Sequence, residues 1–289
     1  MLHRRFLYGF QPDHRTAKPG KFITPVILVI DWIDSQTSTG TQHYLSRNMQ
    51  NSLKNKTYLI AGGSKGIGSA LTQQLLDADA TIHVYSRSEG DLQQSERLVH
   101  HACDFAGEDF ASAEIPETIH GVAYCPGSIN LRSFRSLKLA DFQDDFEINV
   151  LGAIKFLKGC LRGLKKGADE HPTSVVLFST VAVGIGLPMH ASVAVAKGAL
   201  EGLTRTLAAE LAPNTRVNCL APALTETPLA ANFFSTEEKR AAMNAKYPLG
   251  RAGTPSDLAN MAAFLLSPKS DWLTGQVIGV DGGMSAIHS

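Results

Sequence analysis

Three glycines that follow a short apolar run form the first candidate site. Gly62, Gly66 and Gly68 come directly after the apolar residues 57–61, and apolar residues then recur at helical spacing. This change of pattern predicts a strand, a tight turn and a helix. Glycines let a backbone approach a ligand closely, and the amino end of a helix favours negative charge. The turn therefore predicts a site for the pyrophosphate of a dinucleotide, with a glycine turn that binds no ligand as the alternative.

Composition excludes several classes of partner. The chain has 289 residues, of which 44% are hydrophobic, so one large α/β domain with a sizeable core is possible. Lysine plus arginine equals aspartate plus glutamate at 27 each, which leaves no excess charge for nucleic acid or an anionic membrane. The four cysteines show no metal-binding spacing and predict free thiols in a reducing compartment. We expect a cytoplasmic protein.

The first fifty residues differ from the rest. Residues 1–21 are basic, and residues 22–33 form an apolar run that is too short to span a bilayer. No small-residue cleavage site follows this run, so a secretory signal is not expected. A transit peptide and an upstream-extended start before Met49 are two accounts of this region. We therefore interpret residues 1–50 as an N-terminal extension that is disordered or precedes the true start, and residues 52–289 as a single domain.

Short apolar runs alternate with longer helical patterns after residue 52. Strands are predicted at residues 57–61, 81–86, 98–103, 120–125, 174–179, 216–220 and 276–280. Long helices are predicted at residues 139–164, 191–211 and 255–266. This order favours an α/β fold in which right-handed crossovers make the strands parallel and place helices on both faces of the sheet. Residues 87–97 are too few and too polar for a full crossover helix, so a loop or one helical turn is expected there.

Several of these pieces together resemble the short-chain dehydrogenase/reductase family, over roughly residues 54–285. The matching features are the glycine turn, Asp104, Asn149, Lys197, Thr227, and the runs at 216–222 and 273–283. The resemblance implies a Rossmann-like doubly wound parallel sheet of about seven strands with helices on both faces. It also implies a small-molecule substrate and a homotetramer or homodimer that forms through the helices at 139–164 and 191–211.

The resemblance assigns cofactor roles position by position. The phosphates would be held by Gly62, Ser64, Lys65, Gly66, Ile67 and Gly68. Asp104 would meet the adenine, Gly127 would allow close approach of the ribose, Lys197 would hold the nicotinamide ribose, and Thr227 would hold the carboxamide. An ordinary turn or cap role is the alternative for Asp104 and Thr227.

Two basic residues predict which dinucleotide is bound. Lys65 lies inside the glycine turn, and Arg87 ends the second strand where an NAD-binding protein more often has an acid. A cation at that place can pair with the 2′-phosphate of NADP. The sequence favours NADP(H) over NAD(H), although Glu89 lies close by.

The catalytic positions depart from the family pattern. The tyrosine position, four residues before Lys197, is Val193, and the serine position is Thr180. The Asn-Asn-Ala-Gly motif reads Tyr124-Cys-Pro-Gly127. In the family, the tyrosine hydroxyl moves the proton that accompanies hydride transfer. Valine carries no such proton, so the standard mechanism cannot run.

His190 is the candidate replacement for the missing tyrosine. If a helix begins near Met189, His190 lies one turn before Val193 on the same face. An imidazole titrates near neutral pH and can act as a general acid or base. Ser192 points elsewhere on the helix and could instead be its N-cap. A histidine at the pocket rim without a proton-transfer role is the alternative for His190.

Two further segments have simpler interpretations. The four acids Asp141, Asp144, Asp145 and Glu147 are expected on a solvated helix face. Residues 224–247 resemble the family's substrate-covering segment, where Phe233 and Phe234 would shape an apolar pocket or only pack against the helix.

Three functions remain open. The first is an NADP-dependent oxidoreductase for a carbonyl or alcohol, in which Asn149 and Thr180 orient groups, Lys197 holds the ribose and His190 supplies the proton. The second is a catalytically inactive NADP(H)-binding sensor or structural subunit. The third keeps the fold without the cofactor.

Overall fold

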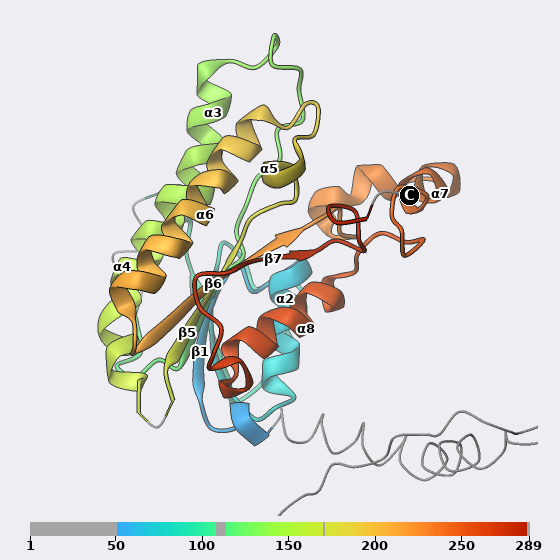
Figure 1. The fold of residues 1–289 in the computed structure, drawn as a ribbon. Helices are drawn as coiled ribbons and strands as arrows, with labels where there is room; N and C mark the ends of the chain where they lie inside the picture. Colours follow the sequence, from blue (N-terminus) through green and yellow to red (C-terminus); the bar gives the residue numbers. More distant parts are fainter. Residues whose placement is uncertain (1–50, 108–113, 170, 288–289) are drawn as a thin grey trace, which may run out of the picture. The chain divides into compact units, whose positions relative to one another are not determined.

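A computed structural model describes residues 51–107, 114–169 and 171–287, which belong to one compact unit (Figure 1). The proposed extension at residues 1–50 lies outside the described residues.

A seven-stranded parallel sheet forms the centre of this unit, with strand order β3-β2-β1-β4-β5-β6-β7. The strands are β1 (Thr57–Ala61), β2 (Thr81–Ser86), β3 (Leu98–Ala102), β4 (Gly121–Tyr124), β5 (Thr173–Phe178), β6 (Thr215–Pro222) and β7 (Val277–Val280). The order reverses between β1 and β4, which is the switch point where doubly wound sheets bind ligands. The α/β fold and all seven predicted strands are confirmed.

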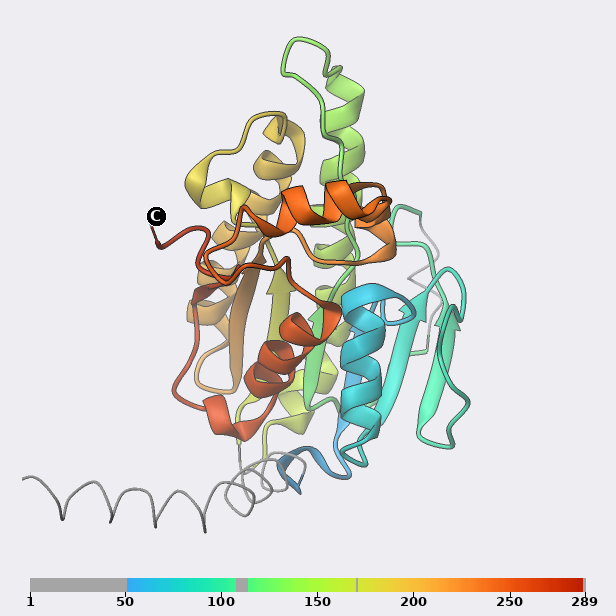
Figure 2. The ribbon, with the colours of Figure 1, turned by 90° about the vertical axis from the view of Figure 1, so that its right-hand side faces the viewer.

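Helices cover both faces of the sheet (Figures 1 and 2). The helical elements are α2 (Gly66–Leu76), α3 (Leu139–Phe146), the π-helical turn η2 (Glu147–Leu151), α4 (Gly152–Gly167), α5 (Ala182–Ile185), α6 (Ala191–Leu211), η3 (Pro228–Phe234), α7 (Glu237–Asn244), α8 (Pro255–Leu266) and η4 (Pro268–Ser270). Helices α2 and α8 pack together on one face, and α4 and α6 cover the other. Among the described residues, no helix has both the length and the apolarity to cross a bilayer.

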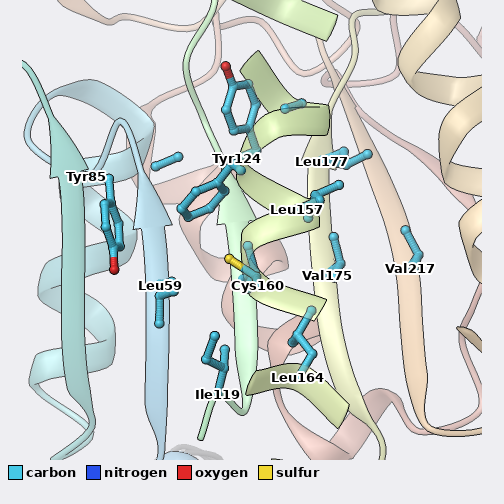
Figure 3. Close-up of a cluster of buried hydrophobic side chains, with 14 of the residues drawn as sticks. Leu59, Tyr85, Ile119, Tyr124, Leu157, Cys160, Leu164, Val175, Leu177 and Val217 are labelled. Atoms are coloured by element: carbon cyan, nitrogen blue, oxygen red, sulfur yellow. The ribbon is translucent and has the colours of Figure 1, made fainter. Parts of the chain in front are cut away.

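Apolar side chains from α4 fill the space above the central strands. Figure 3 shows Leu157, Cys160 and Leu164 of α4 over Leu59 of β1 and Val175 of β5. Each of these five side chains is at most 4% exposed. This packing fixes α4, and with it the preceding turn η2 that contains Asn149, relative to the carboxyl ends of the strands.

The segment between β2 and β3 contains no helix. Residues 87–97 cross as a loop, as their length predicted, and β3 forms one edge of the sheet. The corner beside the glycine turn is therefore built by loop residues.

Candidate active site

The glycine turn lies between β1 and α2, at the carboxyl edge of the sheet. Gly62 and Gly66 have φ angles of +67° and +57°, which residues with a side chain rarely adopt. A Cβ atom on Gly68 would lie 2.2 Å from the carbonyl oxygen of Gly62. The close approach of these two backbones lets α2 begin directly at the turn and point its free N–H groups out of the sheet.

Two predicted cofactor residues have different surroundings. Thr227 precedes η3 and lies opposite the turn, because a Cβ atom on Gly66 would be 3.3 Å from the Thr227 Cβ. Asp104 uses its Oδ1 to accept a hydrogen bond from the Ala106 N–H at 3.1 Å. The structure thus brings Thr227 to the glycine turn, whereas the Asp104 carboxylate also serves a local turn.

The loop after β2 packs on the glycine turn. The Asp91 N–H donates to the Ser64 carbonyl oxygen at 3.2 Å, and Gly90 has a φ of +59°. A Cβ atom on Gly90 would lie 2.4 Å from that same oxygen. The exposed side chains of Lys65 and Arg87 therefore lie at one corner of the sheet. Gly90 was not predicted from the sequence, although a glycine within a short polar loop is a signal for such a close contact.

Gly127, Asn149 and Lys197 meet at the carboxyl edge of β4. A Cβ atom on Gly127 would lie 3.1 Å from Asn149 Oδ1 and 3.3 Å from Lys197 Nζ. Asn149 is fully buried, and its Oδ1 has no hydrogen-bond partner among the described residues. An unpaired buried acceptor is costly and is typical of a site that a ligand or water completes.

Burial dominates the electrostatics of Lys197. Its side chain is 8% exposed, and desolvation lowers the pKa of its ammonium from the usual 10.5 to about 8. Cys219, Cys125 and Asp145 oppose this shift. Burial also raises the pKa of the Cys125 and Cys219 thiols to about 12, so both are uncharged near neutral pH. Lys197 is thus a desolvated cation that can titrate in the weakly alkaline range.

A tyrosine hydroxyl accounts for the π-helical turn that contains Asn149. Tyr124 Oη donates to the Ile148 carbonyl oxygen at 2.6 Å, and the Gly152 N–H bonds instead to the Glu147 carbonyl oxygen. A side chain inserted into the helical ladder is a known cause of such turns. A Cβ atom on Gly152 would lie 2.3 Å from the Tyr124 Oη, so only glycine fits there. Tyr124, a departure from the family motif, therefore shapes the segment that presents Asn149.

The prediction that four acids lie on a solvated helix face is wrong for one of them. Asp145 is fully buried, and its Oδ2 accepts a hydrogen bond from Ser192 Oγ at 2.5 Å. Ser192 therefore cannot be the helix N-cap, because it lies inside α6 with its hydroxyl turned to α3. The neighbouring Asp144 is exposed, as predicted.

The helix predicted at residues 191–211 matches α6, whereas the start near Met189 that would have put His190 on the helix is not observed. Met189 has a φ of +68°, His190 is the N-cap residue, and α6 begins at Ala191. His190 is therefore outside the helix, with its Nδ1 2.7 Å from the Pro188 carbonyl oxygen. Val193 is 5% exposed in the first turn of α6. Thr180 follows β5, and its Oγ1 accepts from the Ala182 N–H at 3.3 Å.

Comparisons with known proteins agree with this architecture. The family model described as Enoyl-(Acyl carrier protein) reductase matches residues 61–285. The 2-(S)-hydroxypropyl-CoM dehydrogenase 3 of Xanthobacter autotrophicus is 32% identical over 258 residues, which cover 83% of this chain and 100% of the relative.

Solved structures show the same fold. A short-chain dehydrogenase family protein from Francisella tularensis superimposes with a TM-score of 0.72 at 27% identity, covering 81% of this chain and 100% of that one. The 3-ketoacyl-(acyl-carrier-protein) reductase of Brucella melitensis, complexed with NADH, gives a TM-score of 0.71 at 25% identity, with coverage of 81% and 100%. The chain belongs to the short-chain dehydrogenase/reductase family, whose members are oxidoreductases that use NAD(P)(H).

Proposed function

We propose that this protein is an NADP(H)-dependent oxidoreductase that acts on a small carbonyl or alcohol substrate with His190 as the proton donor. The observation that carries the proposal is the meeting of Asn149 Oδ1 and Lys197 Nζ beside Gly127. The Asn149 oxygen, a hydrogen-bond acceptor, and the Lys197 ammonium, a cation, are both present there although Val193 occupies the tyrosine position. As in other members of the family, which are commonly oligomeric, a homodimer or homotetramer is the proposed assembly.

The residues present fit a nicotinamide dinucleotide. The turn at Gly62–Gly68 offers backbone N–H groups to the phosphates. Gly127 has no side chain, which leaves room for the ribose at that place. A bound nicotinamide would supply or accept the hydride. Lys197 would hold the ribose hydroxyls, and Thr227 lies opposite the turn to receive the carboxamide.

The corner formed by Lys65 and Arg87 supports NADP(H) over NAD(H). We expect Arg87→Ala to weaken NADPH binding about 10- to 100-fold, since a charge-assisted hydrogen bond contributes about 1.5–3 kcal/mol. NADH binding should change little, because NADH has no 2′-phosphate. Fluorescence titration of both nucleotides measures the selectivity.

Arg97→Ala is the matched control for this loop. Arg97 lies at the other end of the loop and donates to the Asp79 carbonyl oxygen at 3.0 Å. Its removal takes away the same charge without touching the glycine turn. Equal losses for the two nucleotides in Arg87→Ala would contradict the proposed selectivity.

One contact of His190 determines which ring nitrogen is available for proton transfer. Because a carbonyl oxygen only accepts hydrogen bonds, the contact with Pro188 places a proton on His190 Nδ1. His190 Nε2 is then the atom that gives a proton to an alkoxide when the ring is an imidazolium, or takes one from an alcohol when the ring is neutral. Thr180 uses its oxygen as an acceptor, so its O–H can still be donated to a substrate carbonyl.

Replacement of His190 tests this role. We expect His190→Ala to lower turnover at least about 100-fold, the usual scale of general acid–base catalysis, with NADPH affinity nearly unchanged. Turnover is followed by the absorbance of the reduced nicotinamide across a panel of carbonyl compounds. His171→Ala, at the opposite edge of the sheet, is the control. Normal turnover in His190→Ala would refute the assignment.

Val193 supports one other candidate, an NADP(H)-binding sensor or structural subunit without catalysis. A valine supplies no proton, and a protein that only binds the cofactor needs none. This candidate requires NADPH binding without substrate-dependent oxidation across the same panel. Substrate-dependent oxidation by the wild-type protein excludes it.

A further inference from the structure

A buried carboxylate joins three segments around the candidate site. Asp145 lies on α3 one turn before Asn149 and is fully buried. Its Oδ1 accepts from Ser128 Oγ at 2.5 Å and Asn130 Nδ2 at 3.0 Å, and its Oδ2 accepts from Ser192 Oγ at 2.5 Å. The loop after β4, α3 and the first turn of α6 are therefore held by one side chain.

The same group holds the Asn149 amide. Asn149 Nδ2 donates to the Asp145 carbonyl oxygen at 2.7 Å and to Ser128 Oγ at 3.0 Å. Both amide hydrogens are thus used, and the remaining Oδ1 lies against Gly127 beside Lys197. The orientation of Asn149 depends on Ser128, which itself donates to Asp145.

A carboxylate is an expensive choice for a purely structural contact. Burial of an ionised group costs several kcal/mol, and apolar residues at such positions often give equal or greater stability. Asp145 has no cation within ion-pair distance among the described residues, and its partners are two hydroxyls and an amide. Its charge is therefore available to act on the site beside it.

We propose that Asp145 is a positioning residue of the active site, which orients Asn149 through Ser128 and sets a carboxylate close to Lys197. This inference rests on the proposed function, because it assigns a role within the same site. In a site without the tyrosine, a fixed negative charge nearby keeps the lysine a hydrogen-bond donor for ribose hydroxyls at neutral pH.

The charges around Lys197 support this role. Desolvation lowers the Lys197 pKa to about 8, and Asp145 on α3 acts against that shift together with Cys125 after β4 and Cys219 on β6. Burial keeps both thiols protonated near neutral pH, since it raises their pKa values to about 12. Of these three groups, Asp145 is the carboxylate, and its Coulombic effect raises the Lys197 pKa.

The test follows the ionisation of Lys197 in the full-length protein without cofactor. The method is NMR of protein labelled with carbon-13 at lysine Cε, with Lys197→Met for assignment. We expect Asp145→Asn to move the Lys197 midpoint downward by up to about one pH unit. Asp144→Asn removes the same charge from an exposed position of α3 and should leave the midpoint unchanged. A folded Asp145→Asn with an unchanged midpoint overturns the inference.

A second pair of variants tests the orientation of Asn149. Ser128→Ala removes the hydroxyl between Asn149 and Asp145, and we expect NADPH to bind about fivefold more weakly, as the loss of one hydrogen bond predicts. Ser128→Thr keeps the hydroxyl and should restore affinity. If Asp145→Asn fails to fold, the two Ser128 variants provide the test of the inference. Wild-type NADPH affinity in Ser128→Ala overturns it. A wild-type protein that binds no NADPH defeats the proposed function instead, and leaves the lysine titration as an independent result.

Discussion

Lys197→Met makes the protein more stable at pH 7 and weakens cofactor binding. The fall of the Lys197 pKa from 10.5 to about 8 on folding corresponds to a cost of about 3 kcal/mol for the buried ammonium. That cost is fully present below about pH 8 and disappears as the pH rises to the unfolded-state value, because the lysine is then neutral in both states. Methionine has a similar shape without the charge. We therefore expect Lys197→Met to raise the free energy of unfolding at pH 7 by about 2 kcal/mol.

Urea unfolding at fixed protein concentration measures this gain. The difference between Lys197→Met and the wild type should shrink from pH 7.5 to pH 10, which distinguishes a desolvated charge from improved packing. NADPH should bind Lys197→Met about 10- to 100-fold more weakly, since ribose loses a charged donor. Lys246→Met, at an exposed position, is the control and should alter neither property. A loss of stability in Lys197→Met would show that the lysine is structurally favourable.

Gly68→Ala is expected to abolish tight nucleotide binding. The added Cβ would lie 2.2 Å from the Gly62 oxygen, 2.9 Å from the Gly62 carbonyl carbon and 3.0 Å from the Gly63 Cα. All three are backbone atoms, so no rotamer change relieves the overlap and α2 must move away from the turn. We expect a loss of about 2–4 kcal/mol in stability and at least about 100-fold in NADPH affinity.

Ser69→Ala is the matched control for this substitution. Ser69 is the next residue of α2, and alanine is the better helix former there. Thermal unfolding and NADPH titration of the two variants separate a blocked turn from a general effect on α2. Wild-type NADPH affinity in Gly68→Ala would show that the turn does not hold the phosphates.

The fold could be predicted because most of its strands are short, mainly apolar runs separated by polar or helical sequence. All of β1 and β2 matched their predicted residues, and β7 starts one residue later than predicted. The glycine turn could also be predicted from the sequence, since backbone geometry requires glycine at positions 62, 66 and 68.

The polar interior of the site could not be predicted in the same way. Asp145 looks like one of four surface acids, and its burial depends on Ser192, 47 residues away in sequence. The range of α6 was predicted correctly, but the position of His190 outside the helix was not, because the positive φ of Met189 has no signal in a methionine side chain. Local sequence carries neither kind of information, so the surroundings of His190 and Asp145 required the structure.

The hydroxyl of Tyr124 and the missing side chain of Gly152 also bear on how this sequence can evolve. Any larger residue at position 152 meets the Tyr124 Oη, and loss of that hydroxyl leaves the half-buried Ile148 carbonyl oxygen without its donor. The two positions are therefore energetically coupled, and a change at one alters which residues are tolerated at the other. Among descendants of this chain, positions 124 and 152 should vary together, whereas each single replacement passes through a less stable intermediate.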